Sequence, residues 1–350
     1  MKNIHLTQEG LEGNFLPLTL NRAFTDLRLG ILSINKKWLQ LAKIQSVDLG
    51  IQGDASVNAI TVNASFVPKP TLDLLQFLSE GKGQDEHFYS IATPWDLLYH
   101  LPQLIQDDLQ LIGAVNADAM PPGVQQWGSG CCHIAHTATL EPCFINTEGG
   151  AVFIDEGARI MAGSMLRGPL YIGKNSVIKM GTALYAGTVV GDNCILGGEV
   201  KNSIILDNSN KAHHGYLGDS YIGEWCNLGA GTSCSNLKNT AGTIGVWSMG
   251  KKRFEKASDK LGIIMGDHVR TAVNTQFNSG TVIGSFSNIF NTGFLSMKYY
   301  PPFSWGGENT ASYRIDKLLV DVERWMKMKN QQPTPTYIEQ IKELHKRYTA

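Results

Sequence analysis

The chain has 350 residues, with 30 Lys and Arg against 31 Asp and Glu and a formal net charge of -1. This balance gives no sign of a nucleic-acid partner or of binding to an anionic membrane surface, and no window approaches the roughly 18 apolar residues of a membrane span. The first residues lead into a polar segment and the six cysteines show no disulfide pattern, so we expect a cytoplasmic protein with free thiols.

Residues 1–125 are expected to form a small mixed α/β unit. Residues 26–43 have an amphipathic helical pattern, with Thr25 as the N-cap. Residues 59–64 alternate in the manner of a strand. A Thr-Pro pair predicts the start of a second helix over 93–113, because Thr is a good N-cap and Pro fits the first helical position.

The most regular feature is an aliphatic residue at every sixth position between 154 and 196. The series is Ile154, Ile160, Leu166, Ile172, Ile178, Leu184, Val190 and Leu196. Neither a helix nor a strand has a period of six. This period is typical of a parallel β-helix, in which three hexads make a coil of about 18 residues and the aliphatic residues fill its lumen. We therefore expect a mostly β protein with a β-helix over 126–300.

The period breaks after Leu196. We expect it to resume in a shifted register at Ile204, Asn210, Tyr216, Ile222, Leu228 and Cys234, with a second run at Met265, Thr271, Phe277, Ile283 and Ile289. Residues 237–262 interrupt the count and are polar and basic, so we interpret them as a loop that projects from the coil.

Residues 301–350 leave the repeat. Residues 313–329 have apolar side chains on one helical stripe, and a last helix is expected over 337–347. We expect these helices to cap the coil or to pack against it, without a chemical role.

Polar residues crowd one stretch of the coil, between positions 199 and 236. Glu199, Lys201, His213, Tyr216 and Asn227 supply a carboxylate, an ammonium, an imidazole, a phenol and an amide. Because coils stack at about 18 residues, these positions fall on adjacent coils. Together they suit a general base with an orienting acid, an anion anchor and hydrogen bonds to a polyol.

The order and spacing of these residues resemble the acetyltransferase domain of the bifunctional N-acetylglucosamine-1-phosphate uridylyltransferase family. The shared pattern is Glu-x-Lys, a His twelve residues after the Lys, a Tyr three later, an Asn eleven later and a final Asn, Asn236, nine later. The resemblance covers residues 150–295 well and the N-terminal part weakly. It implies a left-handed β-helix, acetyl-CoA as the acyl donor and a homotrimer. The whole chain is similar to a branch of sugar nucleotidyltransferase-like proteins related to that enzyme.

The resemblance also implies catalytic roles. His213 would be the general base that deprotonates an amino group for attack on an acetyl thioester. Glu199 would orient His213 and balance its charge. An imidazole suits this step near neutral pH.

Further residues would bind the substrates. Lys201 would hold the sugar phosphate as a point charge. Tyr216 and Asn227 would hold the acceptor sugar, and Asn236 would lie near the acetyl group. Ala230 would offer a backbone contact to the thioester region.

The sequence departs from the family pattern in three places. The family has an Arg one coil before the Glu-x-Lys, where residues 183–186 here read Ala-Leu-Tyr-Ala. Leu237 replaces an aromatic residue after the last Asn. The basic C-terminal tail that binds coenzyme A is not recognisable, so Lys251 and Lys252 in the basic loop are the candidate substitutes.

Each candidate residue also has a purely structural interpretation. His213 fits a surface histidine on a corner, and Glu199 with Lys201 fits a solvated ion pair of little energetic weight. The asparagines Asn227 and Asn236 fit corner positions. Residues 131–133 read Cys-Cys-His, but adjacent cysteines are poor chelators and no second ligand pair follows at zinc spacing, so no metal site is expected.

Residues 10–22, Gly-Leu-Glu-Gly-Asn-Phe-Leu-Pro-Leu-Thr-Leu-Asn-Arg, resemble the second half of the sugar nucleotidyltransferase signature. The upstream Gly-rich loop that cradles nucleotide phosphates is absent, and no Lys follows Thr19 at the expected place. We interpret the unit as a remnant that has lost nucleotidyl transfer and that now packs against the coil or assists assembly. Three functions stay open: acyl transfer to an amino sugar phosphate or nucleotide sugar, sugar-1-phosphate nucleotidyl transfer by the N-terminal unit, and a non-catalytic trimeric scaffold that binds a nucleotide sugar.

Overall fold

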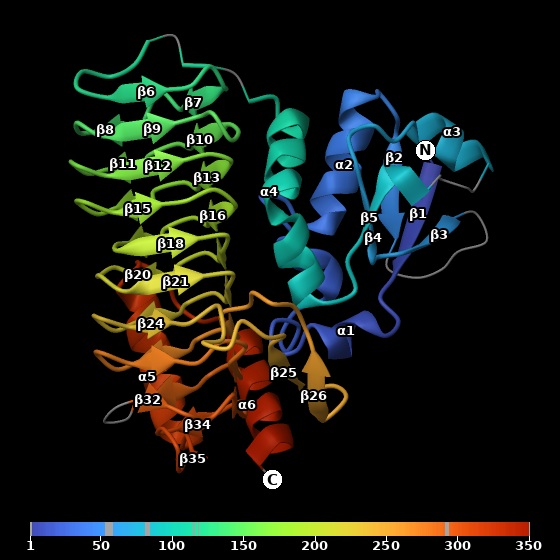
Figure 1. Ribbon diagram of the computed structural model, residues 1–350. Coiled ribbons are helices and arrows are strands. Elements are labelled where there is room, and N and C mark those ends of the chain that lie inside the picture. The colour runs from blue at the N-terminus through green and yellow to red at the C-terminus, as the bar shows by residue number, and fades with distance from the viewer. Residues whose placement is uncertain are drawn as a thin grey trace.

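A parallel β-helix dominates the computed structural model, which describes residues 2–52, 59–80, 85–114, 116–117, 119–290 and 294–349. The N-terminal unit lies beside the upper coils, and the C-terminal helices lie against the lower coils (Figure 1). The expected fold class, a mostly β protein built on a β-helix with an α/β unit and terminal helices, is confirmed. Within the described residues, every helix is too short or too polar to cross a bilayer.

The N-terminal unit contains a small parallel sheet with the strand order β2-β1-β3. Its strands are β1 (Lys2–Thr7), β2 (Leu49–Gln52) and β3 (Ala59–Asn63). A separate antiparallel pair consists of β4 (Phe66–Pro68) and β5 (Phe88–Ser90). Its helices are α1 (Leu11–Asn14), α2 (Ile34–Ile44), α3 (Leu74–Glu80) and α4 (Pro94–Leu111), with 3-10 turns at Phe24–Asp26 and Asp85–His87. The strand predicted over 59–64 is therefore confirmed as β3.

The structure confirms the predicted start of one helix of this unit and corrects that of the other. The Thr93 side chain caps α4 by accepting a hydrogen bond from the Asp96 amide at 3.3 Å, as expected. The helix predicted over 26–43 begins only at Ile34, so the predicted start was wrong. Leu27 and Leu29 are both fully buried in an extended segment, and such alternating burial favours extended chain over helix.

The coil has three faces, which we name by what covers them. The N-face, covered by the N-terminal unit, consists of β7 (Cys132–Ile134), β10 (Val152–Ile154), β13 (Leu170–Ile172), β16 (Thr188–Val190), β19 (Ile204–Ile205), β22 (Tyr221–Ile222), β27 (Ile264–Met265), β30 (Val282–Ile283) and β33 (Tyr299–Tyr300). The C-face, against which the C-terminal helices pack, consists of β8 (Thr139–Leu140), β11 (Arg159–Ile160), β14 (Val177–Ile178), β17 (Ile195–Leu196), β20 (Asn210–Lys211), β23 (Asn227–Leu228), β28 (Arg270–Thr271), β31 (Asn288–Ile289), β34 (Ser304–Trp305) and the antiparallel β35 (Ala311–Ser312).

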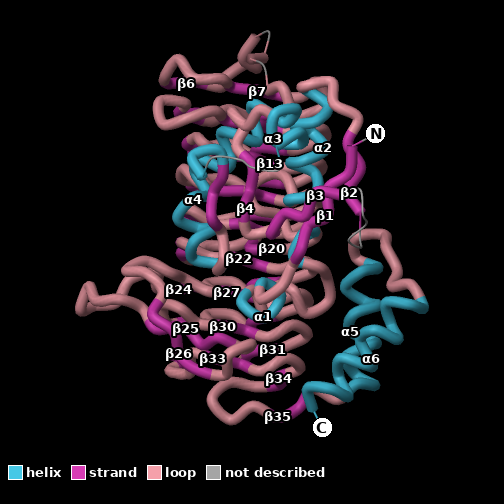
Figure 2. The backbone as a smooth tube through the Cα atoms, turned by 90° about the vertical axis from the view of Figure 1, so that its right-hand side faces the viewer, coloured by secondary structure: helices cyan, strands magenta, loops and turns pink. Residues whose placement is uncertain are grey.

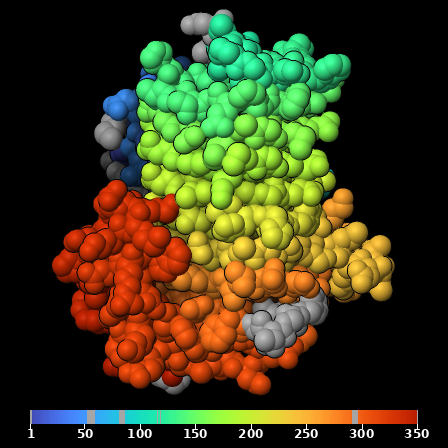
Figure 3. Space-filling view, turned by 90° about the vertical axis from the view of Figure 1, so that its left-hand side faces the viewer, coloured from blue at the N-terminus to red at the C-terminus, as the bar shows by residue number. Residues whose placement is uncertain are grey.

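The third face, the open face, carries neither the N-terminal unit nor the C-terminal helices. It consists of β6 (Gln125–Trp127), β9 (Phe144–Asn146), β12 (Met165–Arg167), β15 (Ala183–Leu184), β18 (Glu199–Lys201) and β21 (Tyr216–Gly218), and it continues below as a short sheet of β24 (Ser233–Cys234), β29 (Gln276–Phe277) and β32 (Phe294–Leu295). The chain passes from the N-face to the C-face and then to the open face while it descends, so the coil winds to the left (Figures 1 and 3).

The hexad series predicted over 154–196 fills the lumen. Ile154 pairs with Ile172, Ile160 with Ile178 and Leu166 with Leu184, so successive coils repeat at 18 residues. All eight side chains of the series are buried in one continuous apolar column. Burial of this column is the main stabilising contribution to the coil.

The register predicted after Leu196 was wrong for three residues. The lumen residues are Val200, Ile205, Lys211 and Leu217, so the predicted positions 204, 210 and 216 are each one residue too early. The cause is a shortened coil: Val200 follows Leu196 by four residues and Ile205 follows Val200 by five, where six were expected. From Ile222 onward the predicted positions do line the lumen. This correction turns Tyr216 outward and Lys211 inward.

The segment predicted to be a projecting loop contains a hairpin of β25 (Gly245–Ser248) and β26 (Arg253–Lys256). Its Trp247 ring stacks on Tyr299 of the N-face, with ring centroids 5.3 Å apart. Gly250 at the hairpin tip packs against Gly13 of α1: a Cβ on Gly250 would lie 2.6 Å from the Gly13 carbonyl oxygen. The hairpin therefore connects the lower coils to the N-terminal unit.

The C-terminal helices are α5 (Ile315–Lys327) and α6 (Pro335–Thr349). Their apolar residues Leu318, Val322 and Ile341 pack on corner residues of the coil such as Phe286 and Phe303. This confirms that both helices pack against the coil. Figure 2 shows α5 and α6 beside the lower coils, and Figure 3 shows that they leave the upper coils bare.

Candidate functional site

Two neighbouring strands of the open face carry three of the predicted site residues. Glu199 of β18 pairs with Tyr216 of β21, and Lys201 pairs with Gly218. The alternate residues Val200 and Leu217 point into the lumen, so Glu199, Lys201 and Tyr216 point outward. The shortened coil is what gives this strand pair its register.

A hydrogen-bond network fixes Tyr216 and Asn236. The Asn236 amide donates to the Tyr216 phenol oxygen at 3.0 Å and to a carboxylate oxygen of Asp219 at 2.5 Å. The other Asp219 oxygen accepts from the Asn202 amide at 2.6 Å. Burial, helped by the Asp219 charge, raises the pKa of Tyr216 to about 12, so the phenol stays protonated near neutral pH.

His213 lies at the corner that leads into β21. Its side chain is exposed, as is that of Glu199 on the next coil. The Glu199 amide donates to the carbonyl of Gly215 at 3.3 Å, which places this corner beside β18. In the part of the chain that the structure describes, no hydrogen bond joins the side chains of His213 and Glu199.

Tight packing holds the corner in place. Gly198 has a φ of 80°, and a Cβ there would lie 2.8 Å from the His213 carbonyl oxygen, so only glycine fits. From inside the lumen, the Lys211 ammonium donates to the carbonyls of His213 at 2.7 Å and Gly197 at 2.9 Å. Burial lowers the pKa of Lys211 to about 8.

The structure places Asn227 on a different face from the other predicted site residues. It lies on β23 of the C-face, where its side-chain oxygen accepts from the Asn210 amide at 3.4 Å. Asn210 in turn accepts from Lys329, just beyond α5, at 3.1 Å. Within one chain, Asn227 is therefore part of the contact with the C-terminal segment and does not meet Tyr216.

Ala230 lies on the corner between β23 and β24. Its carbonyl accepts from the Asn274 amide at 2.6 Å, whereas its own amide donates no hydrogen bond among the described residues. The next residue, Gly231, donates to the His214 carbonyl at 3.2 Å. Ala230 therefore lies one coil below the His213 corner with a free backbone donor.

Lys251 and Lys252 lie at the tip of the β25–β26 hairpin. Lys251 forms an ion pair with Glu255 at 2.9 Å, and the hairpin packs against α1 and the N-face. Within one chain, the structure does not bring these lysines to the open face.

Sequence reasoning missed two residues of the site. Asp219 holds both Asn236 and Asn202, and its own side chain is almost fully buried. The sequence signal for Asp219 was its position directly after Gly218. A carboxylate that is buried there must accept hydrogen bonds from neighbouring coils. Lys211 was missed because the predicted register placed Asn210, one residue earlier, in the lumen.

The segment that resembles a nucleotidyltransferase signature serves as a contact with the coil. Arg22 forms ion pairs with Glu224 at 2.7 Å and with Asp267, and the Asn21 amide donates to Asp267 at 2.8 Å. Thr19 donates to the Glu12 carbonyl at 2.6 Å. These polar groups are thus used within the protein, which favours the interpretation that this unit packs against the coil.

These observations define a hexapeptide-repeat β-helix protein with a polar site on one open face. No family model matches the chain. It is 38% identical over 147 residues to the bifunctional sugar-1-phosphate nucleotidylyltransferase/acetyltransferase of Sulfurisphaera tokodaii, covering 40% of this chain and 35% of that protein. It is 40% identical over 113 residues to the bifunctional protein GlmU of Methanocaldococcus jannaschii, covering 32% and 26%.

The chain is therefore related in sequence to bifunctional nucleotidyltransferase/acetyltransferases, although it spans only about a quarter to a third of the length of the curated relatives it matches. Among solved structures, the polySia-specific acetyltransferase NeuO matches with a TM-score of 0.32 and 14% identity over 59% of this chain and 96% of that one.

Proposed function

We propose that this protein transfers an acetyl group, or a related acyl group, from acetyl-CoA to the amino group of a sugar phosphate or nucleotide sugar. One observation carries the proposal. The open face brings Glu199, Lys201, Tyr216 and Asn236 together, and the His213 corner lies directly beside them. The names of the sequence relatives support the same chemistry.

In this proposal, the acceptor amine attacks the thioester carbonyl, and His213 accepts the proton that the amine loses. The C–S bond then breaks, and coenzyme A leaves as a thiol that carries this proton. The carboxylate of Glu199, on the neighbouring coil, stabilises the resulting imidazolium. Lys201 provides a cation for the phosphate of the acceptor. Tyr216, held through Asn236 and Asp219, offers its hydroxyl to the acceptor sugar, and Asn236 would lie near the acetyl group.

Acetyl-CoA would supply the acyl group already activated as a thioester. The residues near the corner fit this donor in one respect, because the amide of Ala230 is free to donate to a thioester carbonyl. Lys251 fits it less well within one chain, since it is paired with Glu255. We therefore assign the thioester contact to Ala230 and no contact of the same subunit to Lys251 or Lys252.

The proposal includes a homotrimer in the cytoplasm. The candidate residues lie on a face that no described part of the same chain covers, so a neighbouring copy can close the site and exclude water. Asn227 takes part in the C-face contact with the C-terminal segment, and the proposal assigns it no role in the site. All six cysteines are free thiols in the structure, which fits a reducing compartment.

The test is release of free thiol from acetyl-CoA by the purified protein, with panels of amino-sugar phosphates and nucleotide amino sugars. We expect turnover that His213→Ala reduces by about 10²–10⁴-fold. The matched control is His214→Ala, an equally exposed neighbour that should keep turnover. Turnover that persists unchanged in His213→Ala would refute the proposed base. Binding of a nucleotide sugar without any thiol release would instead favour a scaffold.

A further inference from the structure

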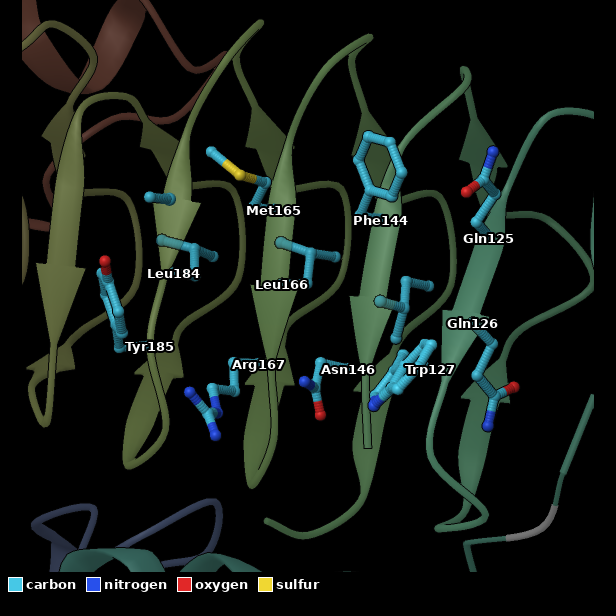
Figure 4. A pocket seen from close by; sticks show the side chains of 12 residues that line it. Gln125, Gln126, Trp127, Phe144, Asn146, Met165, Leu166, Arg167, Leu184 and Tyr185 are labelled. Carbon is cyan, nitrogen blue, oxygen red and sulfur yellow. The ribbon is translucent and has the colours of Figure 1, made fainter. Parts of the chain in front are cut away.

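A second column of outward side chains runs along the open face above the candidate site. The strand register aligns Trp127, Asn146 and Arg167, and it places Tyr185 and Lys201 on the next two rungs. Figure 4 shows Trp127, Asn146, Arg167 and Tyr185 in one row along the strands. We call these five residues the ladder. Its lower end is Lys201, which already belongs to the candidate site.

The upper part of the ladder borders a hollow of about 460 Å³, which lies beside Glu199 and Tyr216 rather than over them. This volume is within the range of about 300–1,000 Å³ that small-molecule sites occupy. Phe144 and Met165 form the opposite, apolar side of the hollow (Figure 4). The hollow thus has the ladder along one side and, along the other, a mainly apolar row that begins at Gln125.

The ladder carries two cations without partners. Neither the Arg167 guanidinium nor the Lys201 ammonium makes a hydrogen bond or an ion pair in the part of the chain that the structure describes. They are two rungs apart, which is about 10 Å at the usual strand spacing. Two long side chains at this distance can converge on one anion that lies between them, over Tyr185.

The aromatic residues indicate what accompanies that anion. Trp127 is 68% exposed although it is the largest side chain of the face, and Tyr185 is also exposed. Exposed aromatic faces bind flat rings by stacking. An arginine fork matches phosphate oxygens, and a lysine adds a point charge. Along the face, the expected order is therefore a place for a flat ring, a place for a phosphate, and then the sugar-binding residues around Tyr216.

We propose that the ladder binds the nucleoside diphosphate part of a nucleotide sugar, with the diphosphate between Arg167 and Lys201 and the base against Trp127. The sugar then reaches the His213 corner, a direction that rests on the proposed function. The acceptor is accordingly a nucleotide sugar and not a free sugar phosphate. Arg167 would supply the second cation that residues 183–186 lack, from one coil further up.

The test is calorimetric titration of the full-length protein with UDP, GDP, CDP, ADP and dTDP, and with inorganic pyrophosphate. We expect at least one nucleoside diphosphate to bind and Arg167→Gln to weaken it about tenfold. Trp127→Ala should weaken the nucleotide by about fivefold or more but leave pyrophosphate binding unchanged. The control is Arg159→Gln, which removes an exposed arginine from the C-face and should change neither.

Three results would overturn the inference: no nucleoside diphosphate binds, Arg167→Gln binds as tightly as the unaltered protein, or Trp127→Ala lowers the mass of the assembly in sedimentation. The last result would show that the ladder contacts a second copy of the chain. Thiol release with an amino-sugar phosphate, in the absence of nucleotide binding, would keep the proposed function and remove this inference. Nucleotide binding without thiol release would keep this inference and remove the proposed function.

Discussion

The Tyr216 ring lies directly over Gly218, two residues along the same strand. A Cβ on Gly218 would lie 2.2 Å from the Tyr216 phenol oxygen and 2.6 Å from the ring carbon that bears it. The missing side chain therefore lets the phenol cross the strand and accept from Asn236. Gly218 helps to position Tyr216 even though it contacts no substrate.

Gly218→Ala should displace the Tyr216 ring and break its hydrogen bond with Asn236. We expect the KM for the acceptor to rise about tenfold, with only a small change in the free energy of unfolding, because the strand stays paired. Steady-state thiol release and urea unfolding measure the two quantities. The comparison is a double-mutant cycle: in a Tyr216→Ala background, Gly218→Ala should have no further effect on KM. A full additional loss there would mean that Gly218 acts independently of Tyr216.

Asp219→Asn should weaken the hydrogen-bond network that holds Asn236 and Tyr216. Asp219 accepts from two amides, those of Asn236 and Asn202, and an asparagine offers only one acceptor oxygen. We expect a loss of about 1–3 kcal/mol in the free energy of unfolding and a parallel fall in turnover. Chemical denaturation and thiol release check both. Asp259→Asn, which changes an exposed carboxylate of the 237–262 segment, is the control that should change neither. Full stability in the Asp219 variant would show that the network is not needed for folding.

The coil could be predicted from sequence because its signal is local. Each lumen residue from Ile154 to Leu196 sits six residues from the next, and burial enforces that spacing. The same rule misplaced Tyr216 and Lys211. Two spacings in this coil are shorter than six residues, four before Val200 and five before Ile205, and a fixed period detects neither. The spacing of residues in the sequence therefore predicted which residue types belong to the site. It did not predict whether each side chain points outward or into the lumen.

Other features depend on contacts between distant segments and have no local signal. Asn227 matches the family spacing, yet its surroundings are set by the segment after α5, more than a hundred residues later. The ladder was missed because its members come from separate coils, and only stacking aligns Trp127 with Arg167.

Arg22→Met tests whether the N-terminal unit is bound to the coil through this residue. Arg22 pairs with Glu224 and the buried Asp267, and its loss leaves both carboxylates without their partner. We expect a loss of about 3–5 kcal/mol in the free energy of unfolding. The control is Arg314→Met, which breaks an exposed pair with Asp316 and should cost at most about 1 kcal/mol.

The same variant separates the two functions of the N-terminal unit that stayed open. Pyrophosphate release from nucleoside triphosphates with a sugar 1-phosphate and Mg²⁺ would report nucleotidyl transfer. Such an activity in the unaltered protein, lost in Arg22→Met without loss of stability, would contradict the packing role.

Lys211→Met should measure how much the buried Lys211 ammonium lowers the free energy of unfolding. The lysine pKa falls from its ordinary 10.5 to about 8 in the folded protein because of burial. Below pH 8 Lys211 is protonated in both the folded and the unfolded chain, and the folded state bears the full free-energy cost of burying the ammonium. Between pH 8 and 10.5 the unfolded chain binds more protons, so the contribution of Lys211 to stability rises with pH. A shift of this size corresponds to about 3 kcal/mol.

Methionine has a similar length and no charge, so it removes this pH dependence. We expect Lys211→Met to gain stability relative to the unaltered protein at pH 7 and to lose that advantage, by about 3 kcal/mol, at pH 10.5. Urea unfolding across this range measures it, with the exposed Lys327→Met as a control that shows no such trend. Turnover should fall even where stability rises, because the His213 carbonyl loses its donor and the corner is no longer held from inside. Unchanged turnover with increased stability would mean that Lys211 does not position His213.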